Sequence, residues 1–234
     1  MDPLIHALVP RGFHCIRVEL FQPASDDSMT PTAITQRWLR DLTEGYRELA
    51  ARYQGCRTYG LGYSLGALAT IRFLQMTTSA TFDGMVLLAP PVSLTARAAF
   101  VRYLAPLAKV GIALPSLAPS AVRARPGTPL VEYSGMLHLI NAVALVGGTD
   151  NLRGIDTRVF LDRRDELVSC AGVTAWIEEH HLTSWATELI QARSGAIAGY
   201  KHLMISEQSL GQEAWLTLTE RIIEHFSGPC APTA

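Results

Sequence analysis

The sequence has few charged residues and no excess of either sign. Only 18% of its 234 residues are charged and the formal net charge is −1, whereas a typical soluble protein is about 25% charged. Disordered chains, fibrous repeats and nucleic-acid-binding proteins with a basic surface all need a different composition. Because 48% of the residues are hydrophobic, we expect one folded domain with a sizeable core and no nucleic-acid partner.

The sequence also lacks an apolar run long enough to cross a membrane. The best candidate, residues 98–122, contains Arg102, Lys109 and three prolines, whereas a spanning helix needs about 20 apolar residues with few or no charges. The first residues, Met1–Pro3, offer no basic segment, and no apolar run follows them as in a signal peptide. We therefore expect a soluble, cytoplasmic protein without a transmembrane segment.

No cysteine spacing in the sequence indicates a metal site or a disulfide framework. The four cysteines, Cys15, Cys56, Cys170 and Cys230, are scattered and form no C-x-x-C pair. Cys15 and Cys56 lie in or beside apolar, strand-like runs, which favours buried free thiols over disulfide bridges.

Short apolar runs alternate with longer helical patterns along most of the chain. This alternation is typical of an α/β fold, in which helices pack on a mostly parallel sheet. We expect strands at residues 15–20, 58–61, 85–89, 157–161 and 185–190. We expect helices at residues 3–10, from Thr30-Pro31 onward, at 67–76, around 170–179, and at the end of the chain around 215–226.

The alternation stops between residues 92 and 153, where the sequence is rich in alanine, leucine and proline. No clear strand is expected there. Apolar or small residues recur at helical spacing, which predicts an amphipathic helix: Phe100, Leu104, Leu107, Gly111 and Leu114. We therefore expect a helical insertion at 92–153 that divides the core into residues 1–91 and 154–234.

The segment 62–66, with the sequence GYSLG, carries the most chemical information. It follows an expected strand and precedes an expected helix, so Ser64 lies on a tight turn flanked by glycines. The hydroxyl would then project from the carboxyl end of the strand, where α/β sheets place their ligands. The alternative is a glycine-rich turn whose serine only caps the helix.

A reactive serine needs a base, and the base needs an orienting acid. In the order Ser, acid, His, the acid belongs after the strand expected at 157–161. Asp165 is the preferred candidate, because it lies past the strand end in a turn before an apolar pair. Asp162 and Glu166 are alternatives, and a solvated charged turn would explain all three.

Only one of the seven histidines fits the third position of this order. Three precede the acidic segment, two end a helix and one lies in the last helix: His6, His14, His138, His180, His181 and His225. His202 remains. It follows the last expected strand and a loop of small residues, and it precedes the final helix.

These three segments (GYSLG, DRRDELV and YKHLMI) resemble the α/β-hydrolase superfamily, above all its branch of carboxylesterases, monoacylglycerol lipases and serine aminopeptidases. The resemblance covers nearly the whole chain. It implies Ser64 as nucleophile, His202 as general base and then acid, Asp165 as orienting carboxylate, and residues 92–153 as a cap over the acyl pocket. It further implies an oxyanion hole that uses the N–H of Leu65.

The resemblance implies a serine hydrolase of carboxylic esters with an aliphatic acyl group, working without metal or cofactor. Two other functions stay open: a thioesterase, and a non-catalytic binding protein of the same fold. The sequence departs from the family because the His-Gly motif of the second oxyanion donor is absent. The family's strand between those expected at 15–20 and 58–61 is absent as well. We expect either a chain with a misplaced or truncated start, which we favour, or a divergent protein in which those two strands pair directly. With one donor missing, we expect a weak esterase at best.

Overall fold

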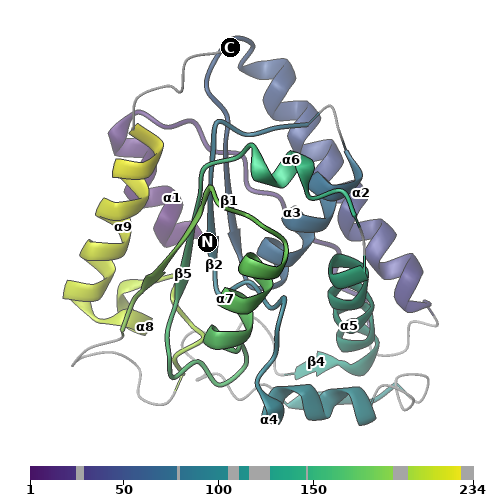
Figure 1. Cartoon of the computed structure of the whole chain (residues 1–234). Helices are drawn as coiled ribbons and strands as arrows, with labels where there is room; N and C mark the ends of the chain where they lie inside the picture. Colours follow the sequence, from purple (N-terminus) through teal and green to yellow (C-terminus); the bar gives the residue numbers. More distant parts are fainter. Residues whose placement is uncertain are drawn as a thin grey trace.

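A four-stranded parallel sheet forms the centre of the protein, in the order β1-β2-β5-β6 (Figure 1). The computed structural model describes residues 1–24, 29–77, 80–104, 111–115, 127–145, 147–191 and 200–227. The strands of the sheet are β1 (Tyr59–Tyr63), β2 (Gly84–Leu88), β5 (Thr157–Leu161) and β6 (Trp185–Leu189). Every residue of β2 is buried, as expected for a parallel strand covered on both faces.

Helices cover both faces of this sheet. The α-helices are α1 (Asp2–Leu8), α2 (Pro31–Arg52), α3 (Leu65–Met76), α4 (Ala96–Ala99), α5 (Leu130–Leu145), α6 (Asp150–Arg153), α7 (Cys170–Glu179), α8 (Glu207–Leu210) and α9 (Gln212–Ser227). Short 3-10 helices follow α1 and α4, namely η1 (Val9–Arg11) and η2 (Phe100–Tyr103). Helices α1 and α9 lie together on one side of the sheet, and α2, α3 and α5 lie together on the other (Figure 1). The expected α/β class is confirmed.

Helix α2 begins where the sequence predicts. The hydroxyl of Thr30 accepts a hydrogen bond from the N–H of Ala33 at 3.2 Å, and Pro31 occupies the first helical position. Ile34 and Trp38 on its inner face are fully buried. The indole N–H of Trp38 donates to the carbonyl of Phe21 at 2.7 Å, which fastens the segment before α2 to the helix.

The prediction of a strand at residues 15–20 is wrong. These residues are extended, but the structure assigns no strand there, and β1 forms the edge of the sheet. The apolar side of the segment packs on α2, where a Cβ at Gly45 would overlap with Val18. A strand also needs a hydrogen-bonded neighbour, and the segment does not pair with β1. Direct pairing of the two strands, the second of our sequence expectations, is therefore wrong too.

The segment between β2 and β5 contains strands that the sequence did not predict. β3 (Ala113–Pro115) and β4 (Gly127–Pro129) form an antiparallel pair. The amphipathic helix expected from Phe100 to Leu114 is wrong in its extent: η2 ends at Tyr103, and Leu114 lies in β3. Gly111 has a φ of 70°, a left-handed conformation that interrupts a helix. Residues 105–110, which include Leu107, lie outside the described residues.

Three of the four cysteines lie in the described residues and are free, as expected, but their burial was predicted wrongly. Cys15 and Cys56 are exposed, and Cys170 is half-buried. Cys15 is exposed because its segment has no strand beside it, and Cys56 lies in the turn after α2. Cys230 lies outside the described residues. In the described part of the chain, no helix combines the length and the apolar character needed to span a membrane.

Candidate active site

Ser64 lies on the sharp turn between β1 and α3. Its backbone has a φ of 48° and a ψ of −121°, a conformation that costs a non-glycine residue about 1–3 kcal/mol and is often found at active sites. The turn is held by a hydrogen bond from the N–H of Ser64 to the carbonyl of Leu88 at 2.8 Å. Gly62 makes the turn possible, because a Cβ there would lie 2.7 Å from the Cα of Ala67.

The hydroxyl of Ser64 does not cap α3, so the alternative of a purely capping serine is wrong. Its Oγ instead lies 2.8 Å from Nε2 of His202. The Nδ1 of the same imidazole lies 2.8 Å from Oδ2 of Asp165. The structure therefore brings the three predicted residues into one chain of hydrogen bonds. They lie in three different loops: between β1 and α3, after β5, and before α8.

The second oxygen of the Asp165 carboxylate, Oδ1, is held by the backbone of its own loop. Its Oδ1 accepts hydrogen bonds from the N–H groups of Leu167 at 2.8 Å and Val168 at 2.9 Å. Both Asp165 and His202 are buried, with 7% of each residue exposed. The turn after β5 thus directs the remaining oxygen of Asp165 at the imidazole, so the imidazole N–H has a single, oriented acceptor.

Solved structures of lipolytic enzymes share this fold. One of the two metagenome-derived lipolytic enzymes LipS and LipT matches with a TM-score of 0.64 at 17% identity, over 94% of this chain and 84% of that one. Monoglyceride lipase from Saccharomyces cerevisiae, in complex with a substrate analogue, matches with a TM-score of 0.57 at 12% identity, over 88% and 72%. Monoacylglycerol lipase from Paleococcus ferrophilus matches with a TM-score of 0.57 at 13% identity, over 82% and 76%. The chain has the α/β-hydrolase fold. No protein-family model matches it, and no curated protein matches it in sequence.

The two alternative acids of the sequence analysis have other contacts in this α/β-hydrolase fold. Oε2 of Glu166 accepts hydrogen bonds from the backbone N–H groups of Lys201 at 3.0 Å and His202 at 3.3 Å. Asp162 is 1% exposed, and its Oδ1 accepts a hydrogen bond from the N–H of Arg164 at 2.8 Å. Its Oδ2 has no hydrogen-bond partner among the described residues. Neither carboxylate contacts the imidazole.

Tyr63 contacts both the backbone and the ring of His202, and these contacts were not predicted from the sequence. Its hydroxyl donates to the carbonyl oxygen of His202 at 3.2 Å, and the two rings lie 5.4 Å apart. Burial raises the pKa of Tyr63, and the charges of Asp165 and Glu166 raise it further, so the phenol stays a neutral donor. Tyr63 and Glu166 thus hold the backbone of His202 while Asp165 holds its ring. In a single sequence, no signal marks either contact.

Leu65 is the first residue of α3. The N–H of a first helical residue has no acceptor within its own helix, and no hydrogen bond of the Leu65 N–H to a described residue is found. The positive end of the helix dipole lies at the same place. The group can therefore donate to an anion that forms beside Ser64.

The segment after β2 is joined to the loop that carries Asp165. Leu94 forms an antiparallel bridge with Val168. The hydroxyl of Thr95 donates to the carbonyl of Glu166 at 2.9 Å. The first residues of the 92–153 segment therefore lie next to the loop that carries Asp165. Within the described ranges, no group of three or more His, Cys, Asp or Glu side chains is placed to hold a metal ion.

Proposed function

We propose that the protein is a serine hydrolase of carboxylic esters. The observation that carries the proposal is the unbroken hydrogen-bond chain from Ser64 through His202 to Asp165. A serine hydroxyl is a weak nucleophile until a base takes its proton, and the base needs an orienting group. Lipolytic neighbours of the same fold support esters as the substrate class.

In the proposed reaction, Oγ of Ser64 attacks the ester carbonyl carbon while its proton passes to Nε2 of His202. The protonated imidazole then gives this proton to the leaving alcohol, and an acyl-enzyme remains on Ser64. Water next attacks the acyl-enzyme and gives a proton to His202, which returns it to Ser64 as the acid leaves. Asp165 accepts the Nδ1–H bond throughout and stabilises the imidazolium. No metal or cofactor takes part.

The N–H of Leu65 is the proposed donor to the oxyanion. It follows the nucleophile directly and belongs to the positive end of α3. Each oxyanion donor is worth about 10²–10³ in kcat. Because the described residues offer no equally evident second donor, we expect slow hydrolysis of activated esters.

We also propose that residues 92–153 include a cap over the acyl pocket. The start of this segment is joined to the loop that carries Asp165, as described above. Phe100 and Tyr103 are 60% and 71% exposed, and this apolar surface would suit an aliphatic acyl chain. Helix α5 packs on α2 and α3 instead, so the cap surface would come from the part of the segment before α5.

A fluorophosphonate probe tests the proposal directly, because it reacts with an activated serine and leaves a mass increment on it. We expect the folded wild-type chain to gain one increment at Ser64. Ser64→Ala should gain none, whereas Ser227→Ala, which changes an exposed serine at the end of α9, should react like the wild type. If folded wild type gains no increment, the protein is not a serine hydrolase and the non-catalytic binding protein is the better hypothesis.

The bond that is cleaved needs a separate measurement. Hydrolysis of p-nitrophenyl esters from acetate to dodecanoate, compared with acyl thioesters of the same chain lengths, reports kcat/KM for each class. We expect higher values for the esters and a preference for chains longer than acetate. A clear preference for thioesters would identify a thioesterase with the same catalytic residues.

A further inference from the structure

Two backbone hydrogen bonds join the segment that follows β2 to the loop that carries Asp165. Each is 2.9 Å long, and they run from the N–H of Thr95 to the carbonyl of Leu167 and from the N–H of Ser169 to the carbonyl of Ser93. They flank the antiparallel bridge between Leu94 and Val168. Residues 93–95 and 167–169 therefore form a short antiparallel ladder.

The carboxylate of Asp165 depends on this ladder. Its Oδ1 accepts hydrogen bonds from the N–H groups of Leu167 and Val168, and both residues are part of the ladder. Helix α7 packs against the same ladder, because a Cβ at Gly172 would overlap with the side chain of Ser93. A shift of either side of the ladder would therefore move the two N–H groups that hold Oδ1 of Asp165.

The hydroxyl of Thr95 connects this ladder to α4. It donates to the carbonyl of Glu166 at 2.9 Å and accepts a hydrogen bond from the N–H of Ala98 at 3.1 Å, so that it caps α4. Glu166 is also the residue whose Oε2 accepts a hydrogen bond from the backbone N–H of His202. One half-buried hydroxyl therefore joins the first turn of α4 to a residue that contacts the histidine.

We propose that Thr95 is a positioning residue for the reaction of Ser64. Its hydroxyl and the ladder hold the loop that carries Asp165 and Glu166, and this loop holds the imidazole of His202 beside the serine. The inference rests on the proposed function, because the imidazole is the base that activates Ser64. A small misplacement of a reacting group lowers the rate strongly, even when its cause lies outside the reacting atoms. Thr95 contacts Glu166 rather than the imidazole, so its effect passes through the loop.

Thr95→Val tests the proposal, because valine has the same shape but lacks the hydroxyl. We expect kcat for ester hydrolysis to fall about 3- to 10-fold, as for the loss of one neutral hydrogen bond, while KM stays unchanged. The loss should be the same for the acetate and dodecanoate esters of p-nitrophenol, because the same three side chains act on both. Thr95→Ser keeps the hydroxyl and should restore kcat. Thr95→Ala is the second variant without the hydroxyl and should behave like Thr95→Val.

A role of Thr95 only in α4 and the proposed acyl-pocket cap predicts a different result. Loss of the hydroxyl would then raise KM, chiefly for the dodecanoate ester, and leave kcat for the acetate ester unchanged. That outcome would overturn the proposal. A variant that is less stable but keeps its kcat below the unfolding midpoint would overturn it as well, because the hydroxyl would then serve stability alone.

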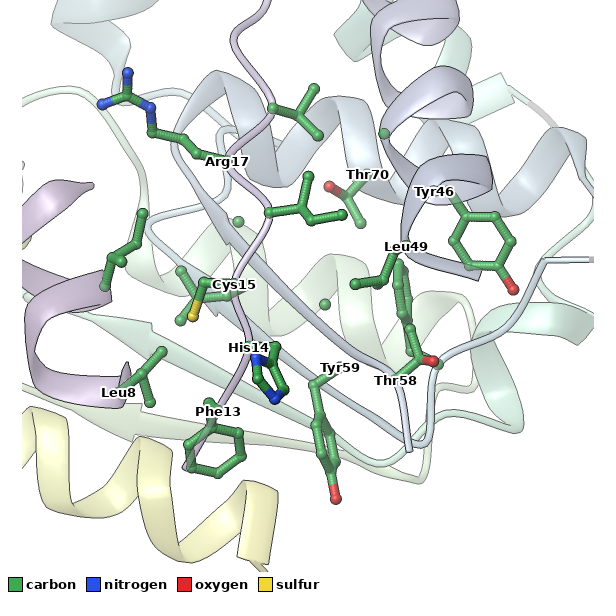
Figure 2. Close-up of a pocket in the computed structure, with 18 of the residues that line it drawn as sticks. Leu8, Phe13, His14, Cys15, Arg17, Tyr46, Leu49, Thr58, Tyr59 and Thr70 are labelled. Atoms are coloured by element: carbon green, nitrogen blue, oxygen red, sulfur yellow. The ribbon is translucent and has the colours of Figure 1, made fainter. Parts of the chain in front are cut away.

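Thr58→Val is the matched control. Thr58 is half-buried like Thr95, and its hydroxyl lies 3.5 Å from the carbonyl of Cys56. It lines the cavity between β1 and the extended residues 13–20 (Figure 2). Thr58 precedes β1, whereas Ser64 follows the other end of that strand, so Thr58→Val should keep the wild-type kcat and KM. An equal loss of kcat in this control would show that the effect is not specific to Thr95, and the proposal would be wrong.

NMR of the His202 ring nitrogens reports on the positioning without any substrate. Nδ1 lies 2.8 Å from Oδ2 of Asp165, so we expect the Nδ1 proton of the wild type to exchange slowly with water. In Thr95→Val this proton should exchange about 3- to 10-fold faster, whereas Thr95→Ser and Thr58→Val should match the wild type.

This measurement separates a failure of the inference from a failure of the proposed function. Equal exchange of the Nδ1 proton in the wild type and Thr95→Val would overturn the inference, whatever the activity. If the wild type neither hydrolyses esters nor reacts with the fluorophosphonate, but its Nδ1 proton still exchanges more slowly than that of Thr95→Val, the proposed function is wrong and Thr95 still positions the imidazole.

Discussion

The side chain of Glu166 accepts a hydrogen bond from the backbone N–H of His202 at 3.3 Å. The neighbouring Asp165 contacts the ring of the same histidine at 2.8 Å. Two adjacent carboxylates thus position one residue: Glu166 binds the backbone of His202 and Asp165 binds its imidazole. A bond to the loop backbone changes where the ring lies but not its chemistry.

Glu166→Ala should lower kcat about 10- to 100-fold, because the lost charge-assisted hydrogen bonds are worth about 1.5–3 kcal/mol. Glu166→Gln keeps an acceptor oxygen and should recover most of the activity. The matched control is Glu179→Gln, an exposed carboxylate at the end of α7, which should behave like the wild type. Ester hydrolysis across the pH range checks this: the profile should keep its shape in all variants while only its height changes. A shifted profile for Glu166→Gln would show that Glu166 acts on the ring.

Asp165 and Asp162 should respond in opposite ways to the same substitution. Asp165→Asn presents an amide to Nδ1 of His202 and should lower kcat by about 10⁴, through the wrong imidazole tautomer. Asp162→Asn keeps the acceptor for the N–H of Arg164 and removes a buried charge whose Oδ2 has no partner among the described residues. It also removes the 3.5 Å ion pair between Oδ1 and Nε of Arg164, which is worth little because the Arg164 side chain is 55% exposed. The substitution should leave kcat near the wild-type value and not lower the free energy of unfolding. Steady-state kinetics and urea unfolding of both variants would identify the wrong assignment if Asp162→Asn proved to be the inactive one.

Tyr63 should make the stability of the protein fall at alkaline pH. Burial, then the charges of Asp165 and Glu166, raise the pKa of its phenol in the folded state, while the unfolded chain releases this proton near pH 10. The stabilisation that comes from this raised pKa is therefore complete below about pH 10. Above pH 10 the free energy of unfolding falls by up to about 1.4 kcal/mol per pH unit.

Urea unfolding at a series of pH values on both sides of pH 10 measures this slope. Tyr63→Phe should show a flatter decline, and it should be less stable than the wild type below pH 10 by about 1–3 kcal/mol, because the carbonyl of His202 loses its donor. Tyr103→Phe is the control, since Tyr103 is 71% exposed and should keep the wild-type slope. Equal slopes in all three proteins would contradict a raised pKa at Tyr63.

The sequence predicted the elements of this fold that local patterns determine. Alternating apolar runs identified the four strands of the sheet, and the chain order together with the expected helices singled out His202. The contacts of Tyr63 and Glu166 with His202 could not be predicted, because they join residues 139 and 36 positions apart and depend on how the loops meet. The strand prediction for residues 15–20 failed for a related reason. Their apolar pattern is that of a strand, but a strand also needs a hydrogen-bonded neighbouring strand, and the pattern does not show whether one is present.

The two glycines around Ser64 should differ sharply in their tolerance of alanine. A Cβ at Gly62 would lie 2.7 Å from the Cα and 2.9 Å from the N of Ala67, whereas a Cβ at Gly66 would meet nothing within 4 Å. Gly62→Ala should therefore displace the turn, reduce fluorophosphonate reactivity and destabilise the fold by about 1–3 kcal/mol. Gly66 lies inside α3, where alanine is favoured over glycine by about 1 kcal/mol, so Gly66→Ala should be at least as stable as the wild type. Thermal unfolding and probe labelling of the pair measure both effects, and equal behaviour of the two variants would contradict the close packing of Gly62 on Ala67.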